Sequence, residues 1–423
     1  MPERRVRAHY TSARPQSPRA RTASYASEPT CFRFPPGKSP RPGPHVFRVL
    51  RDCGRPRPSR ANPHKHPSDK ANRFVRDGTT GLSVRAIRFE SGGAIKLIQV
   101  PNPQPRAEDV LVQVLAAGVC RTDLHLLDEV KAGEHSPLIP GHEIVGRITK
   151  VGEDVYTAKV GDLVGVHFEQ PCGRCRQCRR QRTNLCEDGT TLGFDAPGGY
   201  AEFVVAKQTT ILPLPPKLDL ALAAPLGCSG ATAYRAVVAL GQAEEEDIVV
   251  IVGAGGVGLS AIQVSKAYNA RVFAIEPREE ARKAALDSGA DRAVGPDEAR
   301  AAFRDFAADA GADVAIDFVG TKATFNLGRS LLGPGGRFVA VAPGSEAIEV
   351  SANDLVDGGK AYLGAYSSTM ADFARAISLA EAGRLRPVVT RKAPLANAAE
   401  VLNDLRDGKI IGRAVLFPGP MQL

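Results

Sequence analysis

The segment Asp247-Ile-Val-Val-Ile-Val252-Gly253-Ala-Gly255-Gly-Val-Gly258 decides the fold of this chain. A fully apolar run of β-branched residues that ends at a glycine is typical of a buried strand of a parallel sheet. The pattern Gly-x-Gly-x-x-Gly follows directly and opens an expected helix that reaches about Tyr268. The first glycine makes the tight turn, the second lets the backbone approach a pyrophosphate, and the third lets the helix pack on the strand. The candidate cofactor-binding loop is therefore Gly253, Gly255, Gly256, Val257 and Gly258, at a helix N-terminus that faces the phosphates.

The strand expected at 271–275 ends at an acidic residue, Glu276. A carboxylate there can accept hydrogen bonds from both ribose hydroxyls and repels a 2′-phosphate, which favours NAD over NADP. Arg278 and Arg282 keep NADP open as the less favoured cofactor, and an ordinary charge at a strand end is the alternative for Glu276. Further strand and helix units follow, with strands expected at 313–319, 336–341 and 361–363. Together these units predict an α/β fold with a doubly wound parallel sheet.

The chain from residue 84 has a different pattern, in which short apolar runs alternate with Gly, Pro and Asp turns. The runs lie at 86–89, 95–100, 110–117, 144–151 and 163–166. They predict a small barrel-like β domain, to which the last strand, expected at 411–417, returns.

Chemically reactive side chains follow the third of these runs. Cys120 begins a segment that continues Arg121-Thr122-Asp123-Leu124-His125, and His142-Glu143 follow later. Cys, His and Asp or Glu are zinc ligands, and a catalytic zinc keeps three of them plus an open position. The sequence therefore predicts a catalytic metal centre on the loops of the β domain.

Four cysteines cluster in the next segment, 171–187, and they are Cys172, Cys175, Cys178 and Cys186. This spacing allows all four thiols to bind one tetrahedral zinc, a closed site that holds a loop together and does no chemistry. Two disulfides in a secreted loop are the alternative, which we disfavour because nothing else indicates secretion. Five arginines lie between these cysteines, and we interpret them as a solvated face and not as a nucleic-acid finger.

Cys228 lies at a helix break near Pro225 and Gly227, in an Ala- and Gly-rich segment. Taken alone, such a cysteine is more typical of a small buried hydrophobe than of a ligand. The segments Leu126-Leu127 and 192–194 suggest an aliphatic-lined substrate pocket.

The net charge of +9 over 423 residues conceals two different parts. Residues 1–80 carry 18 Lys and Arg against 5 Asp and Glu, together with 13 of the 32 prolines, whereas the rest of the chain has a net charge of −4. We expect the first part to be a disordered tail. It could be a polyanion-binding arm, a transit peptide, or an inert or mis-assigned start with Val84 as the true beginning, and we favour the last.

No apolar run is long enough to cross a membrane, and no signal-peptide pattern is present. Six of the eight cysteines lie in metal-like clusters, which indicates a reducing compartment. We therefore expect a cytoplasmic protein.

Residues 84–418 resemble the zinc-dependent medium-chain alcohol dehydrogenases of the medium-chain dehydrogenase/reductase superfamily, with five separate motifs in that family's order. The resemblance implies a GroES-like catalytic domain interrupted by a Rossmann domain. The expected division is a tail at 1–83, a GroES-like domain at 84–228, a Rossmann NAD-binding domain at 229–364, and a return to the catalytic domain at 365–423.

The resemblance also implies roles for individual residues. Cys120, His142 and Cys228 would bind the catalytic zinc, and Glu143 would be a transient fourth ligand. The four cysteines of the 171–187 lobe would bind a structural zinc.

The same family pattern implies a proton relay from Thr122 through the cofactor ribose to His125 and water. Asp123 would orient the zinc-bound imidazole. Arg121 and Arg413 would contact the cofactor pyrophosphate.

The function expected from these features is reversible hydride transfer between a primary or secondary alcohol and NAD, with an aldehyde or ketone as the product. A relative that acts on a polyol, an aromatic or a cyclic alcohol is the second hypothesis. A nucleic-acid or polyanion binder that uses the tail is the third, and we disfavour it. A homodimer or homotetramer is expected from the resemblance.

Overall fold

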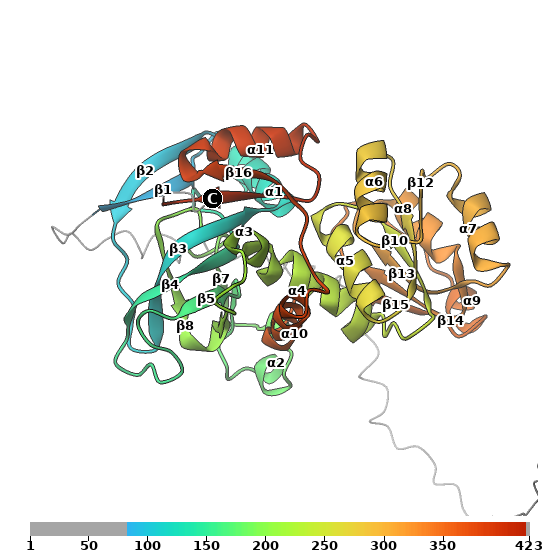
Figure 1. Ribbon diagram of the computed structural model, residues 1–423, viewed down its shortest axis with the longest axis horizontal. Helices are drawn as coiled ribbons and strands as arrows, with labels where there is room; N and C mark the ends of the chain where they lie inside the picture. The colour runs from blue at the N-terminus through green and yellow to red at the C-terminus, as the bar shows by residue number, and fades with distance from the viewer. Residues whose placement is uncertain (1–82, 420–423) are drawn as a thin grey trace, which may run out of the picture. The chain divides into compact units, whose positions relative to one another are not determined.

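The computed structural model describes residues 83–419, so the prediction of a disordered tail at 1–83 falls almost entirely outside the described residues. Two large sheets organise the described part (Figure 1).

The first large sheet has six parallel strands in the order β12-β11-β10-β13-β14-β15. Its strands are β10 (Ile248–Val252), β11 (Arg271–Ile275), β12 (Arg292–Val294), β13 (Ala312–Asp317), β14 (Leu332–Ala340) and β15 (Ala361–Gly364). Strands β11 and β12 extend the sheet on one side of β10, and strands β13, β14 and β15 extend it on the other. This is the arrangement of a Rossmann fold. The doubly wound parallel sheet predicted from the glycine-rich segment is confirmed.

Strand β10 shows why this sheet is covered on both faces. All five of its residues are buried. Val249 and Ile251 belong to one apolar cluster, whereas Ile248, Val250 and Val252 belong to another. Successive side chains of a strand point to opposite faces, so each face of the sheet has its own core. The helices that alternate with these strands along the chain are α5 (Gly256–Ala267), α6 (Glu279–Asp287), α7 (Ala299–Ala307), α8 (Lys322–Arg329) and α9 (Ala352–Val356).

The second large sheet is mixed and follows the order β16-β17-β3-β4-β5-β9, with β8 also paired to β3. Its strands are β3 (Asp109–Val119), β4 (Glu143–Val151), β5 (Leu163–Val166), β8 (Phe203–Lys207), β9 (Ile211–Pro213), β16 (Val389–Pro394) and β17 (Arg413–Phe417). Strand β17 pairs antiparallel with β3, so this last strand lies in the same sheet as β3. The two-stranded sheets are β1 (Ser83–Phe89) with β2 (Ile95–Pro101) and β6 (Glu169–Gln170) with β7 (Thr190–Thr191).

The remaining helices place the reactive side chains. They are α1 (Arg121–Ala132), α2 (Arg176–Arg179), α3 (Leu220–Ala223), α4 (Ser229–Tyr234), a π-helical turn at Arg235–Leu240, α10 (Met370–Glu381) and α11 (Ala398–Arg406). Helix α1 begins after Cys120, whose backbone N–H donates to the Asp123 carboxylate, and it ends at Gly133 in the left-handed conformation. The predicted break before Cys228 is a 3₁₀ turn at Ala224–Gly227.

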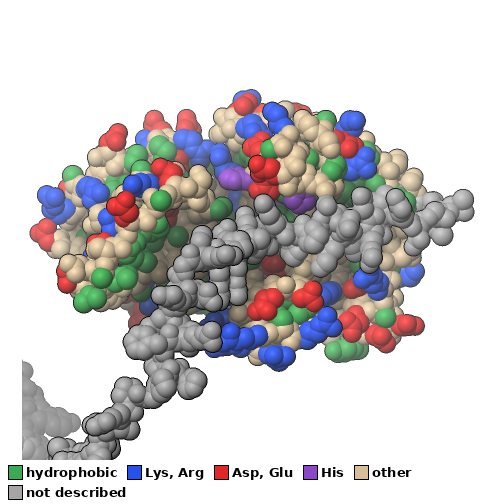
Figure 2. Space-filling model, turned by 180° about the vertical axis from the view of Figure 1, so that it is seen from behind, with side chains coloured by type: hydrophobic (Ala, Val, Ile, Leu, Met, Phe, Trp, Pro, Cys, Tyr) green, Lys and Arg blue, Asp and Glu red, His purple; other side chains and the backbone are tan. Residues whose placement is uncertain are grey.

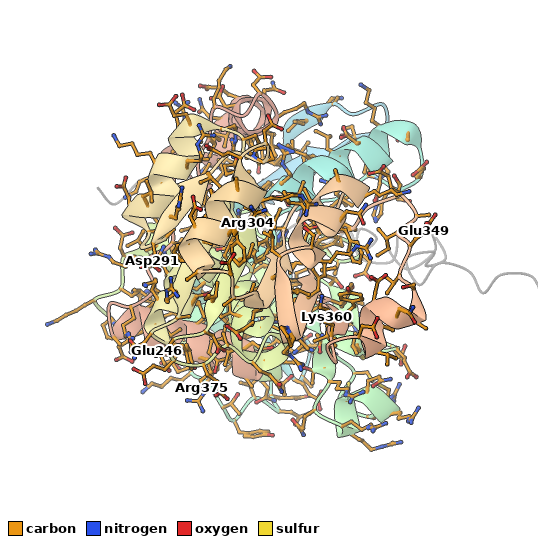
Figure 3. All side chains as sticks on the ribbon, turned by 90° about the vertical axis from the view of Figure 1, so that its right-hand side faces the viewer. Glu246, Asp291, Arg304, Glu349, Lys360 and Arg375 are labelled. Atoms are coloured by element: carbon orange, nitrogen blue, oxygen red, sulfur yellow. The ribbon has the colours of Figure 1, made fainter. Side chains whose placement is uncertain are left out.

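Charges of both signs are interspersed on the surface of the described residues. Figure 2 shows blue and red side chains mixed over one face of the molecule. The six labelled residues of Figure 3 comprise three acidic side chains (Glu246, Asp291 and Glu349) and three basic ones (Arg304, Lys360 and Arg375). No helix in the part of the chain that the structure describes is long and apolar enough to span a membrane.

Candidate active site and metal centres

Four buried donor groups from three separate segments meet in the β domain. Cys120 precedes α1, His142 and Glu143 lie at the start of β4, and Cys228 lies between a 3₁₀ turn and α4. Their ligand atoms all lie within 4.8 Å of one another. A tetrahedral zinc with bonds of about 2.0–2.3 Å holds its ligands about 3.3–3.8 Å apart, so small adjustments bring these groups around one ion.

The thiols of Cys120 and Cys228 shift each other's pKa in opposite directions. The hydrogen bond from Cys228, aided by Arg413, lowers the pKa of Cys120 well below its usual value. The same bond raises the pKa of Cys228. A metal ion bound here would displace the thiol protons, because the ligand form of cysteine is the thiolate.

The carboxyl group of Glu143 also fits a cation site. Burial raises its pKa to about 7, against the opposing effect of Arg413. Its Oε1 accepts a hydrogen bond from Arg413 Nε at 2.9 Å, but its Oε2 has no hydrogen-bond partner within the described residues. An unpaired buried carboxylate oxygen is costly, and a divalent cation held by the neighbouring thiols and imidazole would compensate it. The donor set thus fits zinc.

Arg413 connects this donor set to the glycine-rich loop. Its guanidinium is buried, and Nη2 lies 3.5 Å from Cys120 Sγ. A Cβ atom added at Gly256 would overlap with Arg413 Nη1. Arg413 therefore lies between the candidate metal centre and the candidate cofactor loop, although its only carboxylate contact in the described residues is with Glu143.

Asp123 lies next to the Nδ1 atom of His142, the position that the family resemblance implies for a carboxylate that orients the imidazole. Asp123 Oδ1 is 3.3 Å from His142 Nδ1, and Oδ2 accepts the backbone N–H of Cys120 at 2.9 Å. Burial works to lower the pKa of His142, but Asp123 and Cys120 outweigh it and raise the pKa well above its usual value. The Nδ1 side of the ring is thus directed at Asp123, which leaves Nε2 for the donor cluster.

Three polar side chains near the start of α1, those of Arg121, Thr122 and His125, are exposed, unlike that of Asp123. Thr122 and His125 are exposed and lie three residues apart on a segment that is helical, so they share a face. Thr122 Oγ1 lies 3.5 Å from Cys120 Sγ. Arg121 and His125 line an open cavity of about 400 Å³.

Aromatic rings flank the candidate zinc ligand His142. Its ring lies 5.2 Å from that of Phe168 and 5.4 Å from that of Phe194. Leu126 and Leu127, by contrast, are buried in the apolar core. The aliphatic lining of the substrate pocket therefore stays a prediction.

A second buried histidine, His167, has a structural environment. Its Nε2 lies 3.0 Å from Ser368 Oγ, its Nδ1 accepts the backbone N–H of Glu169, and its ring stacks on Phe168. Burial lowers its pKa to about 4. The imidazole is therefore neutral in the folded protein.

This environment predicts an acid sensitivity of the fold. Between about pH 6.5 and pH 4 the unfolded chain binds a proton at His167 that the folded chain does not, so stability falls as the pH falls. We expect this group to remove about 3 kcal/mol over that window. Urea unfolding at several pH values measures the free energy of unfolding of the parent and of His167→Gln. The difference between the two should shrink by this amount as the pH falls. A gap independent of pH would contradict the assignment.

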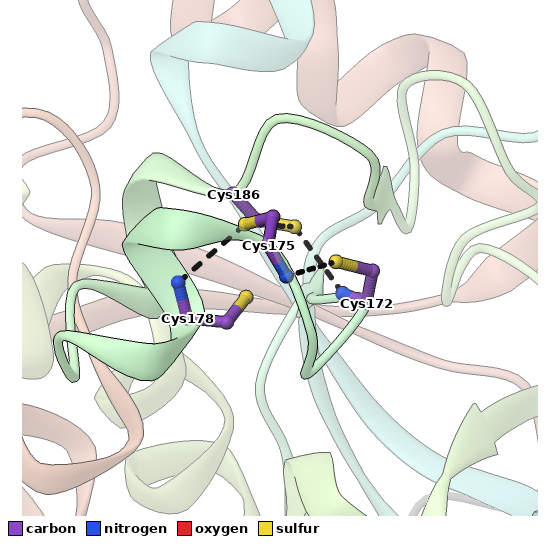
Figure 4. Close-up of side chains that lie close together, drawn as sticks. All are labelled: Cys172, Cys175, Cys178 and Cys186. Atoms are coloured by element: carbon purple, nitrogen blue, oxygen red, sulfur yellow. Dashed lines mark hydrogen bonds between the residues drawn. The ribbon is translucent and has the colours of Figure 1, made fainter.

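The four-cysteine lobe forms the second metal cluster, and Figure 4 shows its thiols converging. The four Sγ atoms lie within 4.8 Å of one another. Backbone N–H groups of the lobe point at the sulfurs: Cys172 N lies 3.2 Å from Cys186 Sγ and Cys175 N lies 3.4 Å from Cys172 Sγ. Amides at Cys178 and Glu187 lower the pKa of Cys175 to about 6. Amides directed at sulfur stabilise thiolates, so the lobe fits a structural zinc.

The glycine-rich loop leaves room for a ligand. Gly253 has a φ of +92°. Nothing lies within 4 Å of the position of a Cβ at Gly255, and a Cβ at Gly258 would overlap with the carbonyl oxygen of Gly253. Gly255 thus keeps open space at the N-terminus of α5, and Gly258 permits the close packing of helix on strand. This loop fits a dinucleotide.

Glu276 follows β11 and is buried beside this loop. Its Oε2 accepts the backbone N–H of Ala254 at 2.9 Å, and its Oε1 accepts Arg278 Nε at 2.9 Å. Arg282 donates to the carbonyl oxygens of Glu276 and Pro277. Arg278 is therefore held by the Glu276 carboxylate, whereas Arg282 is held by backbone carbonyl groups.

Comparison with known proteins agrees with this geometry. Residues 106–216 match the family model of the alcohol dehydrogenase GroES-like domain, and residues 256–382 match that of the zinc-binding dehydrogenases. An NAD-dependent alcohol dehydrogenase of Sulfurisphaera tokodaii is 35% identical over 79% of this chain and 100% of its own. A D-arabinose 1-dehydrogenase (NADP⁺) of Saccharolobus solfataricus is 32% identical over 78% of this chain and 96% of its own.

Solved structures agree as well. The alcohol dehydrogenase of Aeropyrum pernix superposes with a TM-score of 0.72 at 32% identity, over 79% of this chain and 100% of that one. A fold of a GroES-like and a Rossmann domain with two metal clusters defines a zinc-binding dehydrogenase. The chain belongs to the zinc-dependent medium-chain alcohol dehydrogenases of the medium-chain dehydrogenase/reductase superfamily. Zinc and a nicotinamide cofactor are the cofactors that this membership and the two sites support.

Proposed function

We propose that this protein is an NAD-dependent alcohol dehydrogenase that interconverts a primary or secondary alcohol with its aldehyde or ketone at a zinc held by Cys120, His142 and Cys228. The observation that carries this proposal is that these three residues and Glu143 form one buried cluster of donor groups. The guanidinium of Arg413 lies between this cluster and the glycine-rich loop. Zinc in this donor set would supply Lewis-acid chemistry, lowering the pKa of a bound hydroxyl and polarising a carbonyl.

The residues of the chain supply the rest of the site. Phe168 and Phe194 flank His142 and shield the reacting centre from water. Thr122, whose hydroxyl lies beside the Cys120 sulfur, is proposed to hydrogen-bond the hydroxyl of the substrate. His125, which lines the open cavity, is proposed to pass a proton to solvent.

The cofactor loop and Glu276 are proposed to bind NAD. The Glu276 carboxylate would repel the 2′-phosphate of NADP. Arg278, which could otherwise bind that phosphate, is already paired with this carboxylate. Arg121 and Arg413 are proposed to contact the pyrophosphate. The domain boundaries at 228 and 364, the oligomeric state and the cytoplasmic location stay predictions.

The role of Glu276 has a direct test. We expect Glu276→Gln to shift the ratio of kcat/KM for NAD over NADP towards NADP by about 10- to 100-fold, because the amide keeps an acceptor for Ala254 but loses the charge. Glu279→Gln removes a neighbouring exposed charge at the start of α6 and should leave the ratio unchanged. An unchanged ratio in Glu276→Gln would remove this residue as the determinant.

A same-fold dehydrogenase with a polyol, aromatic or cyclic substrate, or with NADP preference, is the second candidate, and the similarity to a D-arabinose 1-dehydrogenase (NADP⁺) favours keeping it. The full chain should be assayed for reduced cofactor with NAD and NADP against simple alcohols, polyols, aromatic alcohols and sugars. Highest turnover with simple alcohols and NAD supports the proposal. Turnover confined to a polyhydroxylated or cyclic substrate would support the second candidate.

A further inference from the structure

Tyr200 is the largest fully buried side chain of the described residues, and its place in the chain gave no hint of a role. Its backbone is fixed on two sides. The N–H of Tyr200 donates to Pro140 O at 3.0 Å, and its carbonyl accepts the N–H of Ile87 at 2.7 Å. The ring packs against Gly141, where a Cβ atom would overlap with Tyr200 Cδ1. Tyr200 therefore contacts the residue that precedes His142.

The hydroxyl of Tyr200 donates to Asp123 Oδ2 at 2.8 Å. The same oxygen accepts the N–H of Cys120, whereas the other oxygen, Oδ1, faces His142 Nδ1 at 3.3 Å. Within the described residues, the one other hydrogen-bond acceptor of this hydroxyl is Gly118 O, at 3.4 Å. Two donors thus hold one carboxylate oxygen and leave the second for the imidazole.

This arrangement has a consequence for the metal centre. A ligating histidine is oriented through the hydrogen bond of its other ring nitrogen, and the partner of that nitrogen must itself be held. Asp123 is buried, and its hydrogen bonds within the described residues come from Cys120 N and the Tyr200 hydroxyl. Without the Tyr200 hydroxyl, Cys120 N would be the only donor left to Oδ2, and the carboxylate could rotate away from His142.

We propose that Tyr200 is a positioning residue of the catalytic metal centre: its hydroxyl fixes Asp123 so that the His142 imidazole is presented to the ion with Nε2. This inference rests on the proposed function of His142 as a ligand. Within the described residues, no hydrogen bond joins Tyr200 directly to Cys120, His142, Glu143 or Cys228. Its effect is expected on metal retention and on ligand geometry, and only through these on turnover.

The test compares Tyr200→Phe with Tyr234→Phe in the full chain. Tyr234 is a matched control, because its hydroxyl contacts only another tyrosine hydroxyl, that of Tyr268, in the described residues. Zinc is withdrawn with a chelator, and the two zinc ions are followed separately. We expect Tyr200→Phe to lose the catalytic zinc about 10- to 100-fold more readily, with the four-cysteine site unchanged. Tyr234→Phe should behave like the parent.

A second readout separates positioning from general stability. With cobalt in the catalytic site, Tyr200→Phe should show an altered visible absorption spectrum, whereas Tyr234→Phe should not. Equal weakening of both metal sites, or an unchanged cobalt spectrum with unchanged zinc release, would overturn the proposal. Both measurements need no turnover. Failure of the parent chain to hold an ion at Cys120, His142 and Cys228 would instead overturn the proposed function.

Discussion

Replacing Cys228 by serine is expected to abolish turnover while the chain stays folded. Serine is nearly isosteric, but its neutral hydroxyl is a poor zinc ligand, so the buried cluster would keep two strong ligands and the weaker Glu143. Lewis-acid stabilisation contributes several kcal/mol, and its loss should lower kcat/KM by about 10³-fold or more. Elemental analysis should show that one zinc per chain is lost and that the zinc of the four-cysteine lobe is kept.

The matched control is Ser229→Ala, which removes a buried hydroxyl beside Cys228 that donates to Pro225 O. This variant should keep both zinc ions and most of the activity. Substantial turnover in Cys228→Ser with one zinc per chain would contradict the ligand assignment.

Arg413→Met should have the largest effect on the fold. The Arg413 and Glu143 side chains are 5% and 0% exposed, and removing one partner of a buried ion pair typically costs about 3–5 kcal/mol. The variant also removes the guanidinium that contacts both the Glu143 carboxylate and the Cys120 sulfur. Binding of NADH should weaken by about 10- to 100-fold if Arg413 contacts the pyrophosphate. Urea unfolding and fluorescence titration with NADH measure the two effects separately.

Lys409→Met is the control, since it breaks an exposed ion pair with Asp407 and should change neither quantity measurably. Parent-like stability in Arg413→Met would show that the Glu143 pair does not stabilise the fold. A lower free energy of unfolding together with parent-like NADH binding would limit Arg413 to a structural role.

Much of the fold was readable from local patterns. The run that became β10 has the apolar length of a buried parallel strand, and the glycines after it fix the start of α5. Strands β6, β7, β8, β9, β12 and β16 were not predicted. They are short or lie at sheet edges: β16, for example, buries only one of its six residues. Such strands form through tertiary pairing and carry little periodicity of their own.

The candidate site was predictable only in part. The thiols, imidazoles and carboxylates were visible by residue type, and the family pattern implied that Asp123 lies behind His142. The pairing of Arg413 with Glu143 and the hydroxyl contact of Tyr200 with Asp123 join residues 270 and 77 positions apart. No spacing rule connects such pairs. Phe168 and Phe194 likewise became neighbours of His142 only through the fold.

The measurement that tests the central claim most directly is chelation of the full chain, with zinc content and NAD-dependent alcohol oxidation followed in the same samples. The account predicts that activity falls in step with loss of the zinc at Cys120, His142 and Cys228, and that it returns when zinc is restored. Full activity in a chain that has lost this ion would contradict the account.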